Sequence, residues 1–187
     1  IRQSCFEPIK KRQNISIMKE RILVTGGTGY IGSHTVVELQ NSGYDVVIVD
    51  NLSNSSADVV DNIEKVSGVR PAFEKLDCLD FEGMDKLFTK YPGIKGIIHF
   101  AASKAVGESV QKPLLYYRNN LVSLINLLEL MPKHGVEGII FSSSCTVYGQ
   151  PDILPVTEEA PIKKAESPYG NTKQINEEII RDTVASG

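Results

Sequence analysis

Near its start the chain carries the stretch Ile22-Leu23-Val24-Thr25-Gly26-Gly27-Thr28-Gly29-Tyr30-Ile31-Gly32, in which an apolar run breaks into glycines and passes directly into a helical pattern. This order is typical of a strand, a tight turn and a helix N-terminus. Without Cβ atoms, Gly26, Gly27 and Gly29 can adopt positive φ angles and present bare amides, while Gly32 lets the helix pack closely on the strand. Because the unpaired N–H groups of the helix would face an anion, the stretch predicts a pyrophosphate site.

A second apolar run ends in an acidic residue at the spacing that dinucleotide-binding folds use. The glycines, read as Gly27-x-Gly29-x-x-Gly32, are followed about 20 residues downstream by Asp50, where such folds place a ribose-binding acid. Its carboxylate would accept hydrogen bonds from both ribose hydroxyls and repel a 2′-phosphate. No Lys or Arg follows Asp50 as far as Ala57, so the sequence favours NAD over NADP. A glycine turn and a strand-end aspartate without any ligand are the alternative.

The composition is that of an ordinary globular protein. The chain has 187 residues, 41% hydrophobic and 23% charged, which predicts one core and one domain. A formal net charge of −3 gives no electrostatic reason to expect nucleic acid or an anionic membrane as a partner, and the apolar runs are too short to span a bilayer. The odd set Cys5, Cys78 and Cys145 lacks metal-type spacing and suits a reducing cytoplasm; with scattered histidines, we expect no metal site.

Apolar strands alternate with helical patterns from Arg21 onward, and the strands are continuous apolar runs, as in a sheet covered on both faces. Right-handed crossovers then predict an α/β fold of the Rossmann type, a doubly wound parallel sheet in the order 3-2-1-4-5. We expect residues 1–17 to be a disordered or added arm and residues 18–187 to form the domain. The predicted strands are 21–25, 45–50, 71–76, 95–101 and 137–142, and the predicted helices are 30–42, about 56–67, 80–91, 113–134 and one from Pro168.

Several polar residues in these elements have two interpretations. Asp77, after the third strand, could meet an adenine or cap the helix near residue 80. His99, in the fourth strand, is interpreted as a core histidine rather than a catalytic one. Asn119 and Asn120 interrupt the apolar face of the helix 113–134, and whichever points inward needs a partner, because an unpaired interior amide costs about 1–3 kcal/mol.

The fifth strand ends in Phe141-Ser142-Ser143-Ser144, at the sheet edge where open α/β folds bind their ligands. Downstream, Ser167-Pro168 is typical of an N-cap and first helical residue, which puts Tyr169 and Lys173 on one helix face. A phenol has a reference pKa of about 10 and is a weak base at neutral pH, but a nearby lysine ammonium stabilises the phenolate. The pair could be an ordinary surface pair, but beside the glycine turn and the serines it predicts a catalytic site.

Together these residues resemble the extended short-chain dehydrogenase/reductase family, in its branch of NAD-dependent epimerases and dehydratases. The resemblance covers Met18 to the end of the chain, and the family's fold agrees with the predicted sheet. The motifs that carry it are Val24–Thr35, Asp50–Ser55, Lys104–Ser109, Tyr116–Asn120, Ser142–Gly149 and Ser167–Gly170.

The resemblance implies an enzyme that interconverts UDP-galactose and UDP-glucose with NAD that it keeps through turnover. Tyr169 would take the proton of the sugar 4′-hydroxyl while hydride leaves the same carbon for NAD, and the keto sugar would take the hydride back on its other face. Lys173 would assist Tyr169 and hold the nicotinamide ribose, and Ser144 would bond the reacting oxygen. Substrate contacts would come from Lys104, Ser144 and Tyr169. Members are commonly homodimers, which here would pair helices 113–134 and 168–186.

The resemblance also marks positions that match cofactor contacts in the family. They lie in the glycine turn, after the second, third and fourth strands, and on the two long helices. They are Gly26, Gly29, Tyr30, Ile31, Gly32, Asp50, Asn51, Leu52, Ser53, Asn54, Ser55, Asp77, Cys78, Phe100, Ala101, Ala102, Ser103, Lys104, Asn119, Tyr169 and Lys173.

Some features depart from the family pattern. Ala102-Ser103 stands where Gly-Leu is usual, and Cys145 where Ala is usual. Members continue past the position of Gly187 into a small domain that grips the nucleotide sugar, so we expect this chain alone to be inactive. Cys145-Thr146 lacks the acidic residues of related dehydratases, which disfavours elimination. Another nucleotide-sugar epimerase, a decarboxylase and a non-catalytic NAD-binding module stay open as alternatives.

Overall fold

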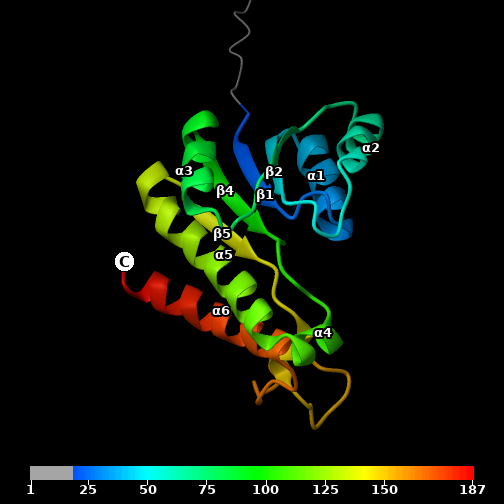
Figure 1. Ribbon diagram of the computed structural model, residues 1–187, viewed down its shortest axis with the longest axis vertical. Helices are drawn as coiled ribbons and strands as arrows, with labels where there is room; N and C mark the ends of the chain where they lie inside the picture. Colours follow the sequence, from blue (N-terminus) through cyan, green and yellow to red (C-terminus); the bar gives the residue numbers. More distant parts are fainter. Residues whose placement is uncertain (1–18) are drawn as a thin grey trace, which may run out of the picture.

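The computed structural model describes residues 19–187, and it places a five-stranded parallel sheet between two layers of helices (Figure 1). The prediction for the N-terminal arm lies outside the described residues. The strands are β1 (Arg21–Thr25), β2 (Asp45–Asp50), β3 (Ala72–Lys75), β4 (Ile94–His99) and β5 (Gly138–Phe141). The helices are α1 (Tyr30–Asn41), α2 (Asp58–Ser67), α3 (Phe81–Lys90), α4 (Val106–Gln111), α5 (Pro113–His134) and α6 (Pro168–Ala185), and Cys145–Tyr148 forms a short 3-10 helix, η1.

The sheet has the order β3-β2-β1-β4-β5, which confirms the predicted topology. The central strand β1 pairs in parallel with β2 and β4, and Thr25 stands opposite both Val49 and His99. The residues that follow these three strands therefore leave the sheet at one edge. Ligands of open α/β sheets bind at this carboxyl edge, where the chain reverses between β1 and β4.

The core occupies both faces of the central strands, as the continuous apolar runs predicted. Leu23 lies on the face covered by α3 and α5, and its neighbour Val24 lies on the face covered by α1 and α2. Both side chains are 0% exposed. Full burial of such a side chain contributes about 1.5–3 kcal/mol, so the central strands form a firm base for the loops at their ends.

The edge strand β5 departs from the prediction that both faces are covered. Its Ile140 is 65% exposed, although the strand is as apolar as the central ones. Among the described residues β5 pairs only with β4, and α6 packs beside α5 (Figure 1). Burial of an apolar strand depends on what packs against it, which the strand's own sequence does not contain.

The element boundaries agree with prediction to within two residues, but two short elements were missed: α4 and η1. Helix α4 has six residues, and its apolar members Val106 and Val110 are both exposed, so it has no buried periodic face to predict it.

The proposed helix-capping role of Asp77 is wrong, because α3 begins at Phe81 and its N-cap is Asp80. The Asp80 carboxylate accepts a hydrogen bond from the Gly83 N–H at 2.9 Å. Asp77 instead accepts from the Leu79 N–H, also at 2.9 Å, within the turn that precedes the helix.

Candidate functional site

The glycine turn contains one left-handed residue, and its other glycines serve close packing. Gly26 has φ 69°, whereas the predicted positive φ is absent at Gly27 and at Gly29, the N-cap of α1. A Cβ at Gly27 would lie 2.7 Å from a methyl carbon of Ile48, and one at Gly32 would lie 2.3 Å from the Gly26 carbonyl oxygen. The helix therefore approaches the turn so closely that only glycine fits. The α1 N-terminus has no side-chain cap, which leaves its amides free for an anion.

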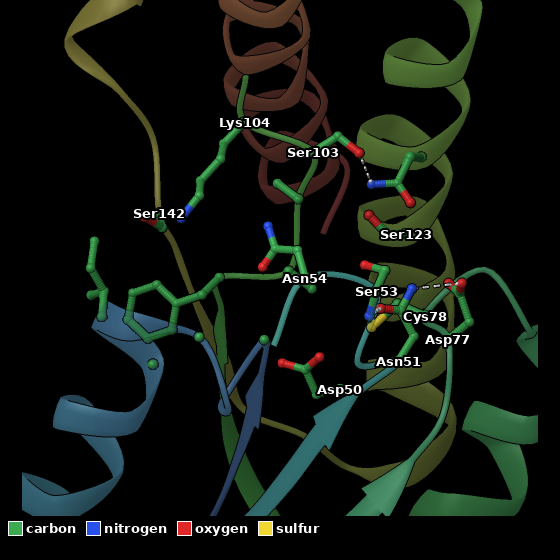
Figure 2. A pocket seen from close by; sticks show the side chains of 18 of the residues that line it. Asp50, Asn51, Ser53, Asn54, Asp77, Cys78, Ser103, Lys104, Ser123 and Ser142 are labelled. Carbon is green, nitrogen blue, oxygen red and sulfur yellow. Dashed lines mark hydrogen bonds between the residues drawn. The ribbon is translucent and has the colours of Figure 1, made fainter. Parts of the chain in front are cut away.

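A cleft of about 570 Å³ opens at the carboxyl edge of the sheet and is long enough to run from the glycine turn to α6 (Figure 2). This volume lies in the range of small-molecule sites. Of the predicted cofactor residues, it is lined by all except Leu52 and Ser55. The predicted residues in its wall are Gly26, Gly29, Tyr30, Ile31, Gly32, Asp50, Asn51, Ser53, Asn54, Asp77, Cys78, Phe100, Ala101, Ala102, Ser103, Lys104, Asn119, Tyr169 and Lys173.

Asp50 lies at the end of β2 with its carboxylate at the floor of the cleft (Figure 2). The carboxylate accepts hydrogen bonds from the Thr28 N–H at 3.2 Å, the Leu52 N–H at 2.9 Å and the Ser55 hydroxyl at 3.0 Å. Leu52 has φ 59°, a left-handed conformation that is costly for a leucine. Leu52 and Ser55 thus hold Asp50 in place instead of forming the wall of the cleft.

The turn after β3 forms another part of the wall. Asn51 donates a hydrogen bond to the Asp77 carboxylate at 3.0 Å (Figure 2). Cys78 beside it is buried, and burial raises the pKa of its thiol to about 12. Cys78 therefore acts as a small apolar wall residue and has little thiolate character at neutral pH.

Of Asn119 and Asn120, it is Asn120 that points inward, and it has the partners that its burial demands. It is 1% exposed, accepts from the Ser103 N–H at 2.8 Å, and donates to the Ser103 carbonyl at 2.9 Å and the Thr172 hydroxyl at 3.0 Å. Asn119 lines the cleft and donates to the Ser103 hydroxyl at 3.2 Å. Since Thr172 lies on α6 between Tyr169 and Lys173, Asn120 ties the loop after β4 to the helix of the predicted catalytic pair.

His99 is a core histidine, as predicted, and it does not line the cleft. It is 2% exposed, and its Nδ1 lies 2.6 Å from the Thr25 hydroxyl oxygen. Burial, together with the positive charge of Lys173, lowers the pKa of His99 to about 3. The ring is therefore neutral at physiological pH.

We expect His99 to make the protein sensitive to acid. Its pKa of about 3 in the folded state lies below the ordinary 6.5, so its contribution to stability is complete above pH 6.5 and is lost as the pH falls towards 3. Over that window the wild type should lose about 1.4 kcal/mol of unfolding free energy per pH unit relative to His99→Asn. Urea unfolding at successive pH values measures this difference. Replacement of the exposed His34 by Asn is the control, and an equal slope in His99→Asn and the wild type would contradict the assignment.

Tyr169 and Lys173 lie at the far end of the cleft on α6, whose start matches prediction. Ser167 caps the helix by accepting from the Gly170 N–H at 3.1 Å, with Pro168 as the first helical residue. The Lys173 ammonium donates to the Ser142 carbonyl at 2.6 Å and lies 6.0 Å from the centre of the Tyr169 ring. Burial lowers the pKa of Lys173 to about 8.

Ser144 lies outside this cleft, in the wall of a neighbouring cavity of about 390 Å³, and Ser143 lines both cavities. The Ser144 hydroxyl oxygen accepts from the Thr146 N–H at 3.3 Å and from the Thr146 hydroxyl at 3.0 Å. Because these bonds use its acceptor sites, Ser144 keeps its own proton for donation.

Several residues in the wall of the cleft were not predicted as site residues, and Glu108 and Tyr116 are two of them. Tyr116 is 0% exposed; its hydroxyl donates to the Glu108 carboxylate at 2.9 Å and accepts from the Ala105 N–H at 3.1 Å. A polar group on the apolar face of α5 was the signal for Tyr116. Glu108 had no such signal, because α4 itself was not predicted.

The described part of the chain, residues 19–187, holds no group of three or more His, Cys, Asp or Glu side chains that could bind a metal ion. None of its helices combines the length and apolar character that a bilayer crossing requires.

The parallel sheet, the glycine turn and the acidic residue after β2 define a dinucleotide-binding α/β domain of the Rossmann type. Comparison with protein families narrows this class. The model of the NAD dependent epimerase/dehydratase family matches residues 22–187, and the chain belongs to this family.

Individual relatives are UDP-glucose 4-epimerases. The chain is 53% identical to the Bacillus subtilis protein over 161 residues, an alignment that covers 86% of this chain and 47% of the relative. It is 49% identical to the human protein over 171 residues, an alignment that covers 88% of this chain and 49% of the relative. A solved structure of the Bifidobacterium longum enzyme in complex with NAD⁺ and UDP superposes with a TM-score of 0.86 at 48% identity, over 89% of this chain and 49% of that one. The chain thus spans about half the length of the relatives it matches.

Proposed function

We propose that the protein to which this chain belongs interconverts UDP-galactose and UDP-glucose by transient oxidation at C4 of the sugar. The observation that carries the proposal is that Tyr169 and Lys173 line the same cleft as the glycine turn and Asp50. A base thus stands at one end of a dinucleotide site. Identity of about 50% to UDP-glucose 4-epimerases supports this choice among nucleotide-sugar enzymes.

The cleft fits NAD by its shape and charge. The uncapped amides at the start of α1 suit the pyrophosphate, and the Asp50 carboxylate suits a ribose with both hydroxyls free. The glycine contacts leave no room for a Cβ where the backbone must approach closely. When bound, NAD supplies a hydride acceptor and donor next to the sugar carbon.

The chain's own side chains then transfer the proton and hydrogen bond to the reacting oxygen. Tyr169 takes the proton from the 4′-hydroxyl as the C4 hydrogen leaves as hydride, and it returns the proton to the same oxygen when the hydride returns. The Lys173 ammonium stabilises the phenolate of Tyr169. Ser144, whose hydroxyl is free to donate, gives a hydrogen bond to the reacting oxygen and keeps its proton, which stabilises the negative charge that grows there on reduction of the keto sugar.

The test uses the full-length protein, UDP-galactose and no added cofactor, with the sugar followed by proton NMR. We expect UDP-glucose to form without net NADH, because the hydride is returned in every cycle. UDP-N-acetylgalactosamine, tested in parallel, reports whether N-acetylated sugars are also accepted. No conversion of either sugar, with NAD recovered from the denatured protein, would favour the non-catalytic binding module instead.

We also propose a homodimer that pairs α5 and α6 of two copies. The two helices lie side by side (Figure 1), and the outer face of α5 exposes Leu115 by 51% and Ile125 by 36%. Ile125→Glu places a charge in this interface, so we expect it to convert the dimer to monomers in sedimentation velocity. Ile153→Glu changes an exposed isoleucine of the loop before α6 and serves as the control. A dimer that persists in Ile125→Glu would contradict this interface.

A further inference from the structure

Helix α6 carries a third polar side chain in line with the catalytic pair. Tyr169, Lys173 and Glu177 follow one another at intervals of four residues and therefore lie on one face of the helix. Lys173 donates to the Ser142 carbonyl at 2.6 Å, and Glu177 accepts a hydrogen bond from the Ser143 hydroxyl. Two successive turns of α6 thus hold two successive residues of the loop after β5, the loop that continues into Ser144.

The positive charge of the buried Lys173 ammonium needs a negative charge nearby to stabilise it. The side chain is 4% exposed, and burial lowers its pKa to about 8, while the negative charge of Glu177 acts in the opposite direction. His99 of β4 is neutral and supplies no negative charge. Besides the Ser142 carbonyl, the Lys173 ammonium contacts the ring of Phe141, whose centre lies 4.5 Å away.

Other charged or titratable groups around the cleft do not replace Glu177. Lys104, from the loop after β4, carries the same sign as Lys173. Tyr116 of α5 and Lys112 both hydrogen bond to Glu108 of α4, at 2.9 Å and 3.1 Å, so this carboxylate already has its partners. The negative charge of Glu177 raises the pKa of Lys173 against the larger effect of burial.

We propose that Glu177 is a positioning residue of the reaction, which fixes the serine loop through Ser143 and keeps Lys173 in its charged form beside Tyr169. Its role in turnover rests on the proposed function, whereas its coupling to Lys173 belongs to the folded protein itself. Neutralising Glu177 should therefore change the pH at which Lys173 loses its proton, with or without substrate.

The first experiment measures the unfolding free energy of the cofactor-free, full-length protein from pH 6 to pH 10 for wild type, Glu177→Gln and the control Glu178→Gln. Since the folded pKa of Lys173, about 8, lies below the ordinary 10.5, wild-type stability rises with pH between these values. In Glu177→Gln this rise should begin about one pH unit lower. The loss of stability relative to wild type is then larger at pH 6 to 7 than above pH 8. Glu178 is exposed and follows Glu177 on the same helix, so its replacement should leave the curve unchanged.

The second experiment measures kcat and KM for UDP-galactose against pH. The alkaline limb of kcat, where Lys173 loses its proton, should move about one unit lower in Glu177→Gln, with KM changed less than about two-fold. Glu177→Asp keeps the charge and should restore the limb. Ser143→Ala removes the hydrogen bond but keeps the charge of Glu177, so the alkaline limb of kcat in this variant should also match wild type. This variant keeps the inference testable if Glu177→Gln does not fold.

The outcomes separate this inference from the proposed function. If Glu177→Gln loses stability equally at every pH and leaves the alkaline limb of kcat unmoved, the role of Glu177 is purely structural and the inference is overturned. A displaced alkaline limb in Ser143→Ala, which keeps the charge of Glu177, would also overturn the inference. If the wild type does not convert UDP-galactose, the proposed function fails, and the stability curves still decide whether Glu177 acts on Lys173.

Discussion

We expect Tyr169→Phe to lower the proposed turnover of UDP-galactose by the full-length protein by about 10³-fold, the middle of the range that general acid–base catalysis contributes. The substitution removes the hydroxyl and keeps the ring, while the backbone of Tyr169 stays fixed by the Thr172 hydroxyl, which donates to its carbonyl at 2.7 Å. The wall of the dinucleotide cleft is otherwise intact, so we expect NAD to remain bound. Loss of turnover with retention of NAD separates an enzyme from a binding module.

The measurement pairs initial rates with the amount of NAD released on denaturation of the full-length protein. Tyr44→Phe removes a tyrosine hydroxyl between α1 and β2, outside the cleft, and should match wild type in both quantities. A Tyr169→Phe variant that keeps the wild-type rate would remove Tyr169 from the mechanism.

Gly32→Ala should abolish measurable NAD binding, with a loss of affinity on the order of 100-fold or more, because α1 would have to move away from the turn that it now touches. The added Cβ would lie 2.3 Å from the Gly26 carbonyl oxygen and 2.9 Å from the Gly27 Cα, both backbone atoms. Overpacking of this kind costs about 1–3 kcal/mol of unfolding free energy. The sign of the change in unfolding free energy is informative, because alanine in a helix interior otherwise stabilises a protein by about 1 kcal/mol relative to glycine.

Denaturant unfolding and titration with NAD measure the two effects of Gly32→Ala. Gly138→Ala is the matched control, because a Cβ at Gly138 in β5 would meet no atom within 4 Å. Unchanged NAD affinity in Gly32→Ala would show that the contact between α1 and the glycine turn does not shape the cofactor site.

The residues at the two ends of the cleft show which parts of the site can be predicted from the sequence alone. The glycine turn, Asp50 and the Tyr169–Lys173 pair were predicted because each is a local pattern: a turn that requires glycine, an acid at the end of an apolar run, and two side chains one helical turn apart. The roles within such a pattern were less predictable. Only Gly26 of the turn adopts a positive φ, since one left-handed residue suffices to reverse the chain there.

Contacts between distant segments could not be predicted. Asn120 rather than Asn119 points into the protein, and its partners Ser103 and Thr172 lie 17 and 52 residues away in the sequence. The hydrogen bond between Ser143 and Glu177 joins residues 34 positions apart. No local pattern contains these pairs, because they form only once α5 has packed against the loop after β4, and α6 beside α5 and against the loop after β5.

The sequence by itself determined the parallel α/β fold, the order of its strands and the chemistry available at the carboxyl edge of the sheet. Steric limits on the backbone and the burial of apolar runs act over a few residues, and they leave little choice of local structure or of strand connection. The tertiary structure alone decided that Ile140 is exposed, that Ser144 opens into a neighbouring cavity, and that Glu177 accepts a hydrogen bond from Ser143. Exposure, cavity shape and hydrogen bonds between distant residues depend on which surfaces meet in space, and that is settled only when all the elements pack together.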